Sequence, residues 1–229
     1  MSSLRARILS SEFAGETLSK KVFKVENITI RLETKKDYRE TENMVREAFW
    51  DIYKPGCDEH LILHKLRKVP EFIEELDFVA CDANENNRIV GNIVCSGAKI
   101  INSQDQEYTV LCLGPLSVLP RYQGRGIGSL LVNRSLQKAK FLDYKAVILF
   151  GDPDYYHRFG FENAKKYNIT TAQGENSDAF MALELYDNSL DGIQGRFIEN
   201  PVFQVESEEL ESFEKEFPDK EKDGTDTQK

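Results

Sequence analysis

The stretch from residue 121 to residue 128 reads Arg-Tyr-Gln-Gly-Arg-Gly-Ile-Gly and lies between a β-branched, apolar segment and a long amphipathic one. This arrangement predicts a tight turn that leads from a strand into a helix. Three glycines at alternate positions, Gly124, Gly126 and Gly128, leave backbone N–H groups uncovered by side chains. The helix that follows directs its positive N-terminal end at the same place, so the turn predicts a binding site for phosphate.

The charge around this turn differs from that of the rest of the chain. Residues 119–145 contain six basic residues and one acid, whereas the 229-residue chain has a formal net charge of −9. A local basic block of this kind attracts a multiply charged phosphate ligand. Nucleic acid needs a broader basic face than such an acidic chain offers, so we expect no nucleic-acid partner.

The spacing of the glycines distinguishes this turn from two well-known kinds of phosphate-binding turn. A dinucleotide-binding turn needs G-x-G-x-x-G, but here the third glycine falls one residue early, and the Gly-Lys-Ser/Thr of a Walker loop is absent. The residues present are Gln-x-x-Gly-x-Gly at positions 123–128, preceded by Leu-Ser-Val at positions 116–118. On its own this turn could also be a strand-to-helix connection without a ligand. It resembles motif A of the GNAT superfamily of acetyl-CoA-dependent N-acetyltransferases.

A second motif follows in the order that the same superfamily has. After an apolar strand at residues 146–150, residues 156–161 read Tyr-x-x-x-Gly-Phe, which resembles motif B. The resemblance extends over residues 28–185 and is greatest to a bacterial-type subgroup with Gly-Asp-Pro-x-Tyr-Tyr, found here at residues 151–156. It implies an α/β (α+β) GNAT fold: a mixed central sheet of about six to seven strands, helices on both faces, and a splayed strand pair that holds coenzyme A.

The resemblance also implies which residues bind acetyl-CoA as co-substrate. The backbone of residues 116–118 would contact the pantetheine arm and the acetyl carbonyl, and residues 124–129 would surround the pyrophosphate. The implied coenzyme-binding residues are Leu116, Ser117, Val118, Arg121, Gln123, Gly124, Arg125, Gly126, Ile127, Gly128 and Ser129. Many family members have an asparagine before the motif B helix, where this chain has Gly-Asp-Pro, so that contact is not transferred.

Tyr156 is the candidate catalytic acid, because it occupies the tyrosine of motif B. A phenol with an ordinary pKa near 10 is protonated at neutral pH and can give its proton to the departing thiolate. The alternative is that Tyr156, like its neighbour Tyr155, only packs. No residue identifies itself as the base. Trp50, Tyr53, Glu59 and His60 are close enough in sequence to face the acceptor together, and the favoured alternative for Glu59 is a solvated position at the start of a helix.

The chain divides into regular elements that fit this fold. We expect strands at residues 27–32, 76–81, 88–101, 108–118, 145–150 and 179–185, and helices at residues 36–53, 58–69 and 125–141, with a short helix from Asp152 that has Pro153 at its first position. The strands at 76–81 and 88–101 should form a hairpin, and Gly114-Pro115 should produce a bulge or a splay in the strand that contains it.

Length and composition favour one domain with extensions. We assign residues 1–26 to a flexible N-terminal extension or weak targeting segment, 27–186 to the acetyltransferase domain, 187–217 to a packed C-terminal extension, and 218–229 to a disordered acidic tail. Leu210, Phe213 and Phe217 recur at helical spacing and could dock on the domain. No apolar run reaches the length of a membrane span and no secretory signal is present, so we expect a cytoplasmic protein.

The cysteines and histidines do not predict a metal or redox site. The four cysteines lack C-x-x-C spacing, and three lie in strand-like apolar segments, as reduced cysteines do in the cytoplasm. His60 and His64 are four residues apart, but no acid lies between them and no third ligand is evident. His157 is expected at the surface.

The resemblance implies an N-acetyltransferase that moves acetyl from acetyl-CoA to a primary amine by direct attack in a ternary complex. A small-molecule amine is favoured as acceptor, and a protein amine stays open. The segment at residues 187–203 could cover a sheet edge or form a homodimer contact. One alternative is a non-catalytic module of the same fold that senses acyl-CoA; another is a purely structural domain that does not bind the coenzyme.

Overall fold

The computed structural model describes residues 25–222, so expectations about residues 1–24 and 223–229 lie outside the described part of the chain. Its helices are α1 (Tyr38–Phe49), α2 (Glu59–Leu66), α3 (Ile127–Phe141), α4 (Pro153–Tyr156) and α5 (Ser207–Glu214). Its strands are β1 (Ile28–Leu32), β2 (Phe72–Asp82), β3 (Arg88–Ile101), β4 (Glu107–Val118), β5 (Ala146–Phe150), β6 (Glu162–Asn163), β7 (Ile169–Thr170), β8 (Phe180–Glu184) and β9 (Gly195–Ile198).

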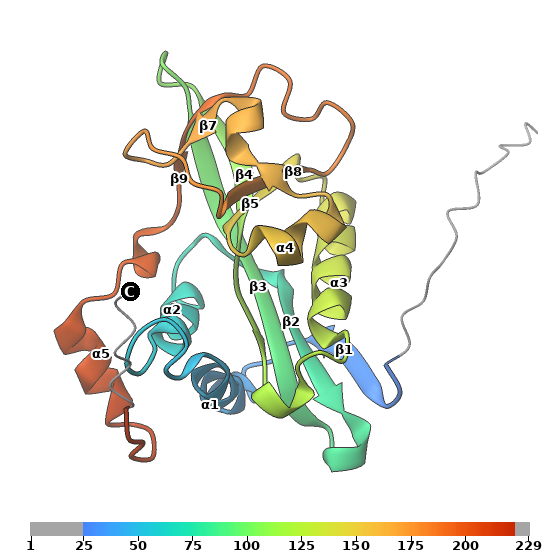
Figure 1. Cartoon of the computed structure of the whole chain (residues 1–229), viewed down its shortest axis with the longest axis vertical. Coiled ribbons are helices and arrows are strands. Elements are labelled where there is room, and N and C mark those ends of the chain that lie inside the picture. Colours follow the sequence, from blue (N-terminus) through green and yellow to red (C-terminus); the bar gives the residue numbers. More distant parts are fainter. Residues whose placement is uncertain (1–24, 223–229) are drawn as a thin grey trace, which may run out of the picture.

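The strands form one mixed sheet in the order β1-β2-β3-β4-β5-β8-β6, and β9 joins it by pairing with β3 and β7 (Figure 1). The pairs β4–β5 and β7–β9 are parallel, and the others are antiparallel. The predicted hairpin is therefore confirmed as the antiparallel pair β2–β3. The described residues contain nine strands instead of six to seven, because β6, β7 and β9 are two to four residues long. Such short strands show no clear alternation in sequence.

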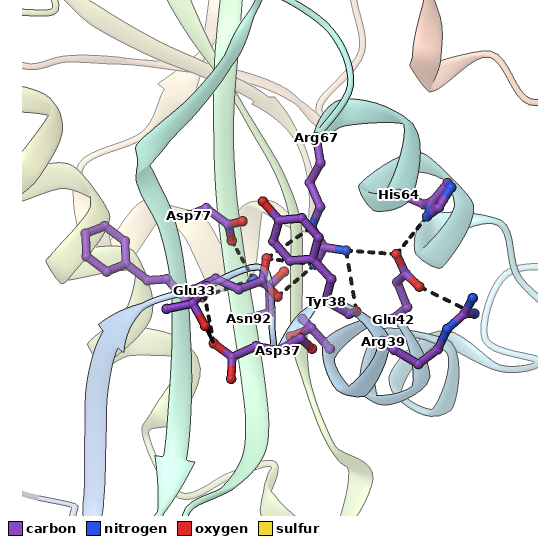
Figure 2. Close-up of polar contacts among 12 residues, drawn as sticks. Glu33, Asp37, Tyr38, Arg39, Glu42, His64, Arg67, Asp77 and Asn92 are labelled. Atoms are coloured by element: carbon purple, nitrogen blue, oxygen red, sulfur yellow. Dashed lines mark hydrogen bonds and ion pairs between the residues drawn. The ribbon is translucent and has the colours of Figure 1, made fainter.

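Helices cover both faces of the sheet, as expected. The Cys95 sulfur on β3 lies 3.2 Å from the Ser135 hydroxyl of α3. Asn92, three residues earlier on the same strand, faces the opposite way. It joins a buried polar cluster that includes Glu42 of α1 and Arg67 at the end of α2 (Figure 2). Helix α3 thus packs on one face and α1 and α2 on the other (Figure 1). Strand β3 is buried along almost its whole length because it lies between these two layers.

The buried polar cluster fastens the α1–α2 pair to the sheet. The Arg67 guanidinium lies 2.7 Å from Glu33 and 2.9 Å from Glu42, and all three side chains are almost fully buried. Beside them, the Asn92 amide donates to the Asp77 carboxylate at 2.9 Å (Figure 2). Burial, together with the neighbouring Glu33, raises the pKa of Asp77 well above its usual value. Asp77 therefore keeps its proton to a higher pH than a solvated aspartate and can donate it to Glu33.

The C-terminal extension packs against the outer side of α1 and α2. The His60 ring on α2 stacks on Phe213 at 5.3 Å and meets Phe217 edge-on at 5.1 Å. Arg46 of α1 forms a 2.7 Å ion pair with Glu214 of α5. The predicted docking of Leu210, Phe213 and Phe217 is confirmed. Phe213 and Phe217 are buried in one apolar cluster with Leu61 of α2, and Leu210 packs against this cluster.

Residues 219–222 differ from the expectation of a disordered tail that begins at residue 218. The Lys220 ammonium lies 2.8 Å from Glu47 on α1, and the Glu221 carbonyl accepts a 2.9 Å hydrogen bond from the Trp50 indole. The acidic composition suggested disorder, but it contains no information about the Trp50 indole, a buried N–H group that needs an acceptor. The packed extension therefore continues at least to Lys222.

Candidate coenzyme and acceptor site

Strands β4 and β5 separate part-way along their length. They pair at Leu111 with Val147 and at Cys112 with Ile148, and β4 then continues to Val118 without pairing to β5. On the other side, β4 holds one residue more than β3 between two paired positions, at the point where Gly114-Pro115 lies. The predicted bulge and splay are thus both confirmed. Unpaired backbone groups on an open strand edge can accept an extended amide chain as an added strand.

The turn before α3 exposes a group of backbone donors. Gly124 and Gly126 have φ values of 72° and 87°, in the left-handed region that favours glycine. The Ile127 side chain is buried and fixes the start of the 15-residue helix in the core. Among the described residues, the amides of residues 124–129 donate no hydrogen bond, and the first paired amide is that of Leu130. These free donors at a helix N-terminus fit an anion.

The polar side chains of the turn differ in their availability. The Gln123 side-chain amide donates to the Val118 carbonyl at 3.0 Å and ties the turn to the end of β4. Arg121 forms an ion pair with Glu85. The Ser117 hydroxyl is buried and has no partner in the described chain. Arg125 is exposed, lies 5.2 Å from the Tyr122 ring, and forms no ion pair within residues 25–222, so its guanidinium is available to a phosphate.

Helix α4 places Tyr156 between the splay and the helix pair. The Asp152 carboxylate accepts the Asp154 amide at 2.9 Å as the N-cap, and Pro153 takes the first helical position, as expected. The Tyr156 ring is 9% exposed and lies over the backbone of Gly151, where a Cβ would come within 2.7 Å of ring atom Cδ2. Burial raises the pKa of Tyr156. The phenol is therefore fully protonated at neutral pH and can act as a proton donor.

Tyr155 connects α4 with the phosphate turn. Its hydroxyl lies against Gly128, where a Cβ would overlap it, and it interacts with the Ser129 hydroxyl. Its ring meets the Tyr156 ring edge-on at 5.0 Å. Gly128 is therefore required for the approach of Tyr155.

A cavity of about 800 Å³ opens beside Tyr156. Its wall includes the open part of β4, the segment from β5 into α4, the ends of α1 and α2, and residues of the C-terminal extension. The lining residues are Phe49, Tyr53, Glu59, Ile62, Cys112, Leu113, Gly114, Pro115, Leu116, Phe150, Gly151, Asp152, Pro153, Tyr155, Tyr156, Ala179, Glu199 and Phe203. The cavity thus joins the splay, Tyr156 and the helix pair, which is the geometry that a two-substrate transfer needs.

Of the residues expected to face the acceptor, two line the cavity and two do not. Tyr53 and Glu59 line it. Trp50 instead packs under Arg46, whose guanidinium lies 4.2 Å from its ring, and His60 packs against α5. Burial lowers the pKa of His60 to about 4, so the ring is neutral at physiological pH. Glu59 and His60 are adjacent on α2 and therefore point in different directions, and Trp50 and Tyr53 follow the end of α1, where the helical spacing no longer holds.

Several cavity residues were not predicted from the sequence, and two of them belong to the C-terminal extension. Glu199 and Phe203 come from the segment after β9, far from both motifs. Burial raises the pKa of Glu199 and also that of Glu59. The apolar Pro-Val-Phe at residues 201–203 was the one available signal that this segment packs on the domain.

Three other observations concern the surroundings of the site. His157 is exposed, as expected, and its Nδ1 lies 2.8 Å from the Phe161 carbonyl. Within residues 25–222, no three side chains suited to metal binding gather at one place. None of the helices in that range combines the length and the apolar character that crossing a membrane requires.

The chain is similar to known proteins over most of its length. The model of the Acetyltransferase (GNAT) family matches residues 42–161. The Escherichia coli K12 protein named Uncharacterized N-acetyltransferase YhbS is 28% identical over 166 residues, which cover 72% of this chain and 92% of that protein. The protein YjhQ of the same strain, also named an uncharacterized N-acetyltransferase, is 31% identical over 80 residues, 35% of this chain and 44% of that protein.

Solved structures show the same fold. The crystal structure of Escherichia coli YhbS in complex with CoA is similar with a TM-score of 0.68 and 26% identity, over 78% of this chain and 93% of that one. A GNAT family acetyltransferase from Brucella melitensis in complex with acetyl-CoA gives a TM-score of 0.63 and 27% identity, over 77% and 98% of the two chains.

Proposed function

This chain belongs to the GNAT family of acetyltransferases, and we propose that it transfers acetyl from acetyl-CoA to a primary amine by direct attack in a ternary complex. The enzyme class and the acetyl donor follow from the family and from relatives whose structures contain CoA or acetyl-CoA. The kind of acceptor, the direct mechanism and the roles of single residues are the proposal. A small-molecule amine is the favoured acceptor, because the cavity beside Tyr156 has a volume of about 800 Å³ and is lined by side chains from several elements.

The coenzyme lies along the splay and the phosphate turn in this proposal. The pyrophosphate accepts hydrogen bonds from the amides of residues 124–129, which are otherwise unpaired, and Arg125 adds a charged contact. The pantetheine arm follows the open edge of β4 at residues 113–118. The Gln123 side chain holds the end of β4 against the turn, so it orients the donors instead of binding phosphate itself.

Transfer then proceeds through one tetrahedral intermediate. The neutral amine nitrogen forms a bond to the acetyl carbonyl carbon, and a backbone N–H near Leu116 stabilises the oxyanion, a contribution of about 3 kcal/mol. The carbon–sulfur bond breaks as the intermediate collapses. Tyr156 gives its phenolic proton to the sulfur, the proton lost by the amine passes to water, and the phenolate then regains a proton from water.

The observation that supports this function best is the buried Tyr156, which lines the same cavity as the open strand edge. Replacing Tyr156 by Phe tests it. We expect a turnover lower by a factor of about 10² to 10⁴, the usual contribution of a general acid, in an assay of thiol release. The dissociation constant for CoA, measured by calorimetry, should stay close to that of the wild type.

Tyr108→Phe serves as the matched control, because Tyr108 lies at the start of β4 and its hydroxyl contacts Gln106. An undiminished turnover in Tyr156→Phe would remove Tyr156 from this role. Binding of CoA with no turnover on any amine would instead support a module that senses acyl-CoA.

A further inference from the structure

The cavity beside Tyr156 carries negative charge and no positive side chain. Its lining residues include three carboxylates, Glu59, Asp152 and Glu199, but neither Lys nor Arg. Asp152 is engaged as the N-cap of α4. Glu59 and Glu199 form no ion pair with any residue of the described chain, so both charges are available to a ligand.

Glu199 is the less satisfied of the two carboxylates. It is half-buried, and its one polar contact within the described residues is a long one, from the Cys112 sulfur to a carboxylate oxygen at 4.0 Å. Burial is the cause of its raised pKa, and no cationic group offsets it. Glu59 accepts one backbone hydrogen bond, from the Asp58 amide at 3.1 Å. A carboxylate partly removed from water without a cation is unfavourable, so a bound cation would gain most at Glu199, whereas Lys54 already offsets part of the rise in pKa that burial causes at Glu59.

Aromatic rings form much of the remaining wall. Phe49 and Tyr53 come from the α1 side, and Phe150 and Phe203 come from the end of β5 and from the extension. Tyr53 and Phe150 are 80% and 50% exposed, so their rings are free to contact a ligand. Such rings pack against apolar chains and also attract cations through their faces.

Resting on the proposed function, we propose that the acceptor is an amine with an apolar body and a second positive charge, and that Glu199 binds this second charge. The first amino group reacts beside Tyr156. Glu199 matches the one cationic group, and the aromatic wall accommodates the apolar chain between this group and the neutral amine that reacts. Amines that carry a carboxylate are disfavoured, because the cavity has no cation to pair with it.

This selectivity depends on the C-terminal extension. Glu199 and Phe203 lie outside residues 42–161, the part of the chain that the family model matches. The coenzyme-binding turn lies inside that part. The common core therefore binds the donor, and the extension selects the acceptor.

Three amines of similar length test the inference: 1,5-diaminopentane, 1-aminopentane and 6-aminohexanoate, each with acetyl-CoA in the thiol-release assay. We expect kcat/KM for the diamine to exceed that for the monoamine by about tenfold, the effect of one charge-assisted hydrogen bond. The aminohexanoate should be the poorest acceptor. In Glu199→Gln, the ratio of kcat/KM for diamine to monoamine should fall about tenfold, through KM for the diamine.

The control variant is Glu175→Gln, which removes an exposed carboxylate outside the cavity. Equal use of diamine and monoamine, preference for the aminohexanoate, or an unchanged ratio in Glu199→Gln would overturn the inference and leave the proposed function intact. If no amine releases thiol although calorimetry detects CoA binding, the proposed function fails, and the acceptor inference fails with it.

Discussion

At the scale of single residues, the position of the Tyr156 ring depends on the absence of a side chain at Gly151. The φ of Gly151 is not in the left-handed region, so the backbone itself accepts alanine. A Cβ there would overlap ring atom Cε2 and lie 2.7 Å from Cδ2, so the ring must then move. The requirement for glycine is therefore one of space, and it directly concerns the proposed proton donor.

Gly151→Ala should consequently lower turnover without removing the tyrosine. Because a displacement of about 1 Å between reacting groups can lower the rate roughly 10²-fold, we expect turnover to fall by about one to two orders of magnitude. CoA affinity should be retained, since the phosphate turn is on another element. The control is Gly97→Ala on β3, where a Cβ would meet Glu71 at an ordinary 3.6 Å. Equal activity of both variants would show that ring position does not matter.

The buried Asp77 gives the protein a stability that depends on pH. Its pKa is raised in the folded state by burial and by Glu33. The folded protein thus binds a proton that the unfolded chain has already released, and stability is lost as pH rises from the unfolded pKa, near 4, to the folded value. Below pH 4 this contribution is fully present.

Asp77→Asn imitates the protonated carboxyl, because its amide can donate to Glu33 while its oxygen accepts from Asn92. We expect this variant to match the wild type near pH 4 and to exceed its unfolding free energy at pH 8 by on the order of 1 kcal/mol. Urea unfolding at both pH values measures this. The exposed Asp178→Asn is the control. If the variant and the wild type differed in unfolding free energy by the same amount at both pH values, the assigned protonation of Asp77 would be contradicted.

At the scale of elements, boundaries were predictable where periodicity and stop signals coincide. Strand β3 occupies Arg88–Ile101, as its long apolar run between polar turns predicted. Helix α1 was expected at residues 36–53 but ends at Phe49. Apolar spacing continues to Ile52, yet Trp50 leaves helical geometry and Asp51 has a φ of 57°. The Trp50 indole reaches the Glu221 carbonyl, a distant contact that no local pattern contains.

The two halves of the candidate site were predictable to different degrees. The coenzyme side consists of consecutive residues in a turn, so a motif describes it, and the splay followed from Gly114-Pro115. The acceptor side brings together residues from α1, α2, β4, α4 and the extension. Glu59 and Glu199 are far apart in the sequence. Both line the same cavity because β9, which ends just before Glu199, pairs with β3.

At the scale of the whole molecule, the helices lie in layers on both sides of the sheet that carries the candidate site. Helix α3 and the phosphate turn lie on one face of the sheet, and α1 and α2 lie on the other (Figure 1). Helix α5 packs outside α1 and α2, so the extension supports the acceptor wall from behind while residues 199–203 contribute to its surface. Donor and acceptor sites can therefore be perturbed separately.

Phe213→Ala tests this separation. Phe213 is 6% exposed and packs on His60 and His64 of α2, the helix that presents Glu59 and Ile62 to the cavity. Removing a ring at the edge of the core should lower the unfolding free energy by about 2–3 kcal/mol, below the usual value for a central phenylalanine. Because α2 loses its outer support, KM for the amine should rise several-fold, whereas KM for acetyl-CoA should change little. Phe141→Ala, at an 81% exposed position on α3, should alter neither stability nor KM. A parallel rise of both KM values in Phe213→Ala would show instead that α5 stabilises the fold as one unit and does not act on the acceptor wall.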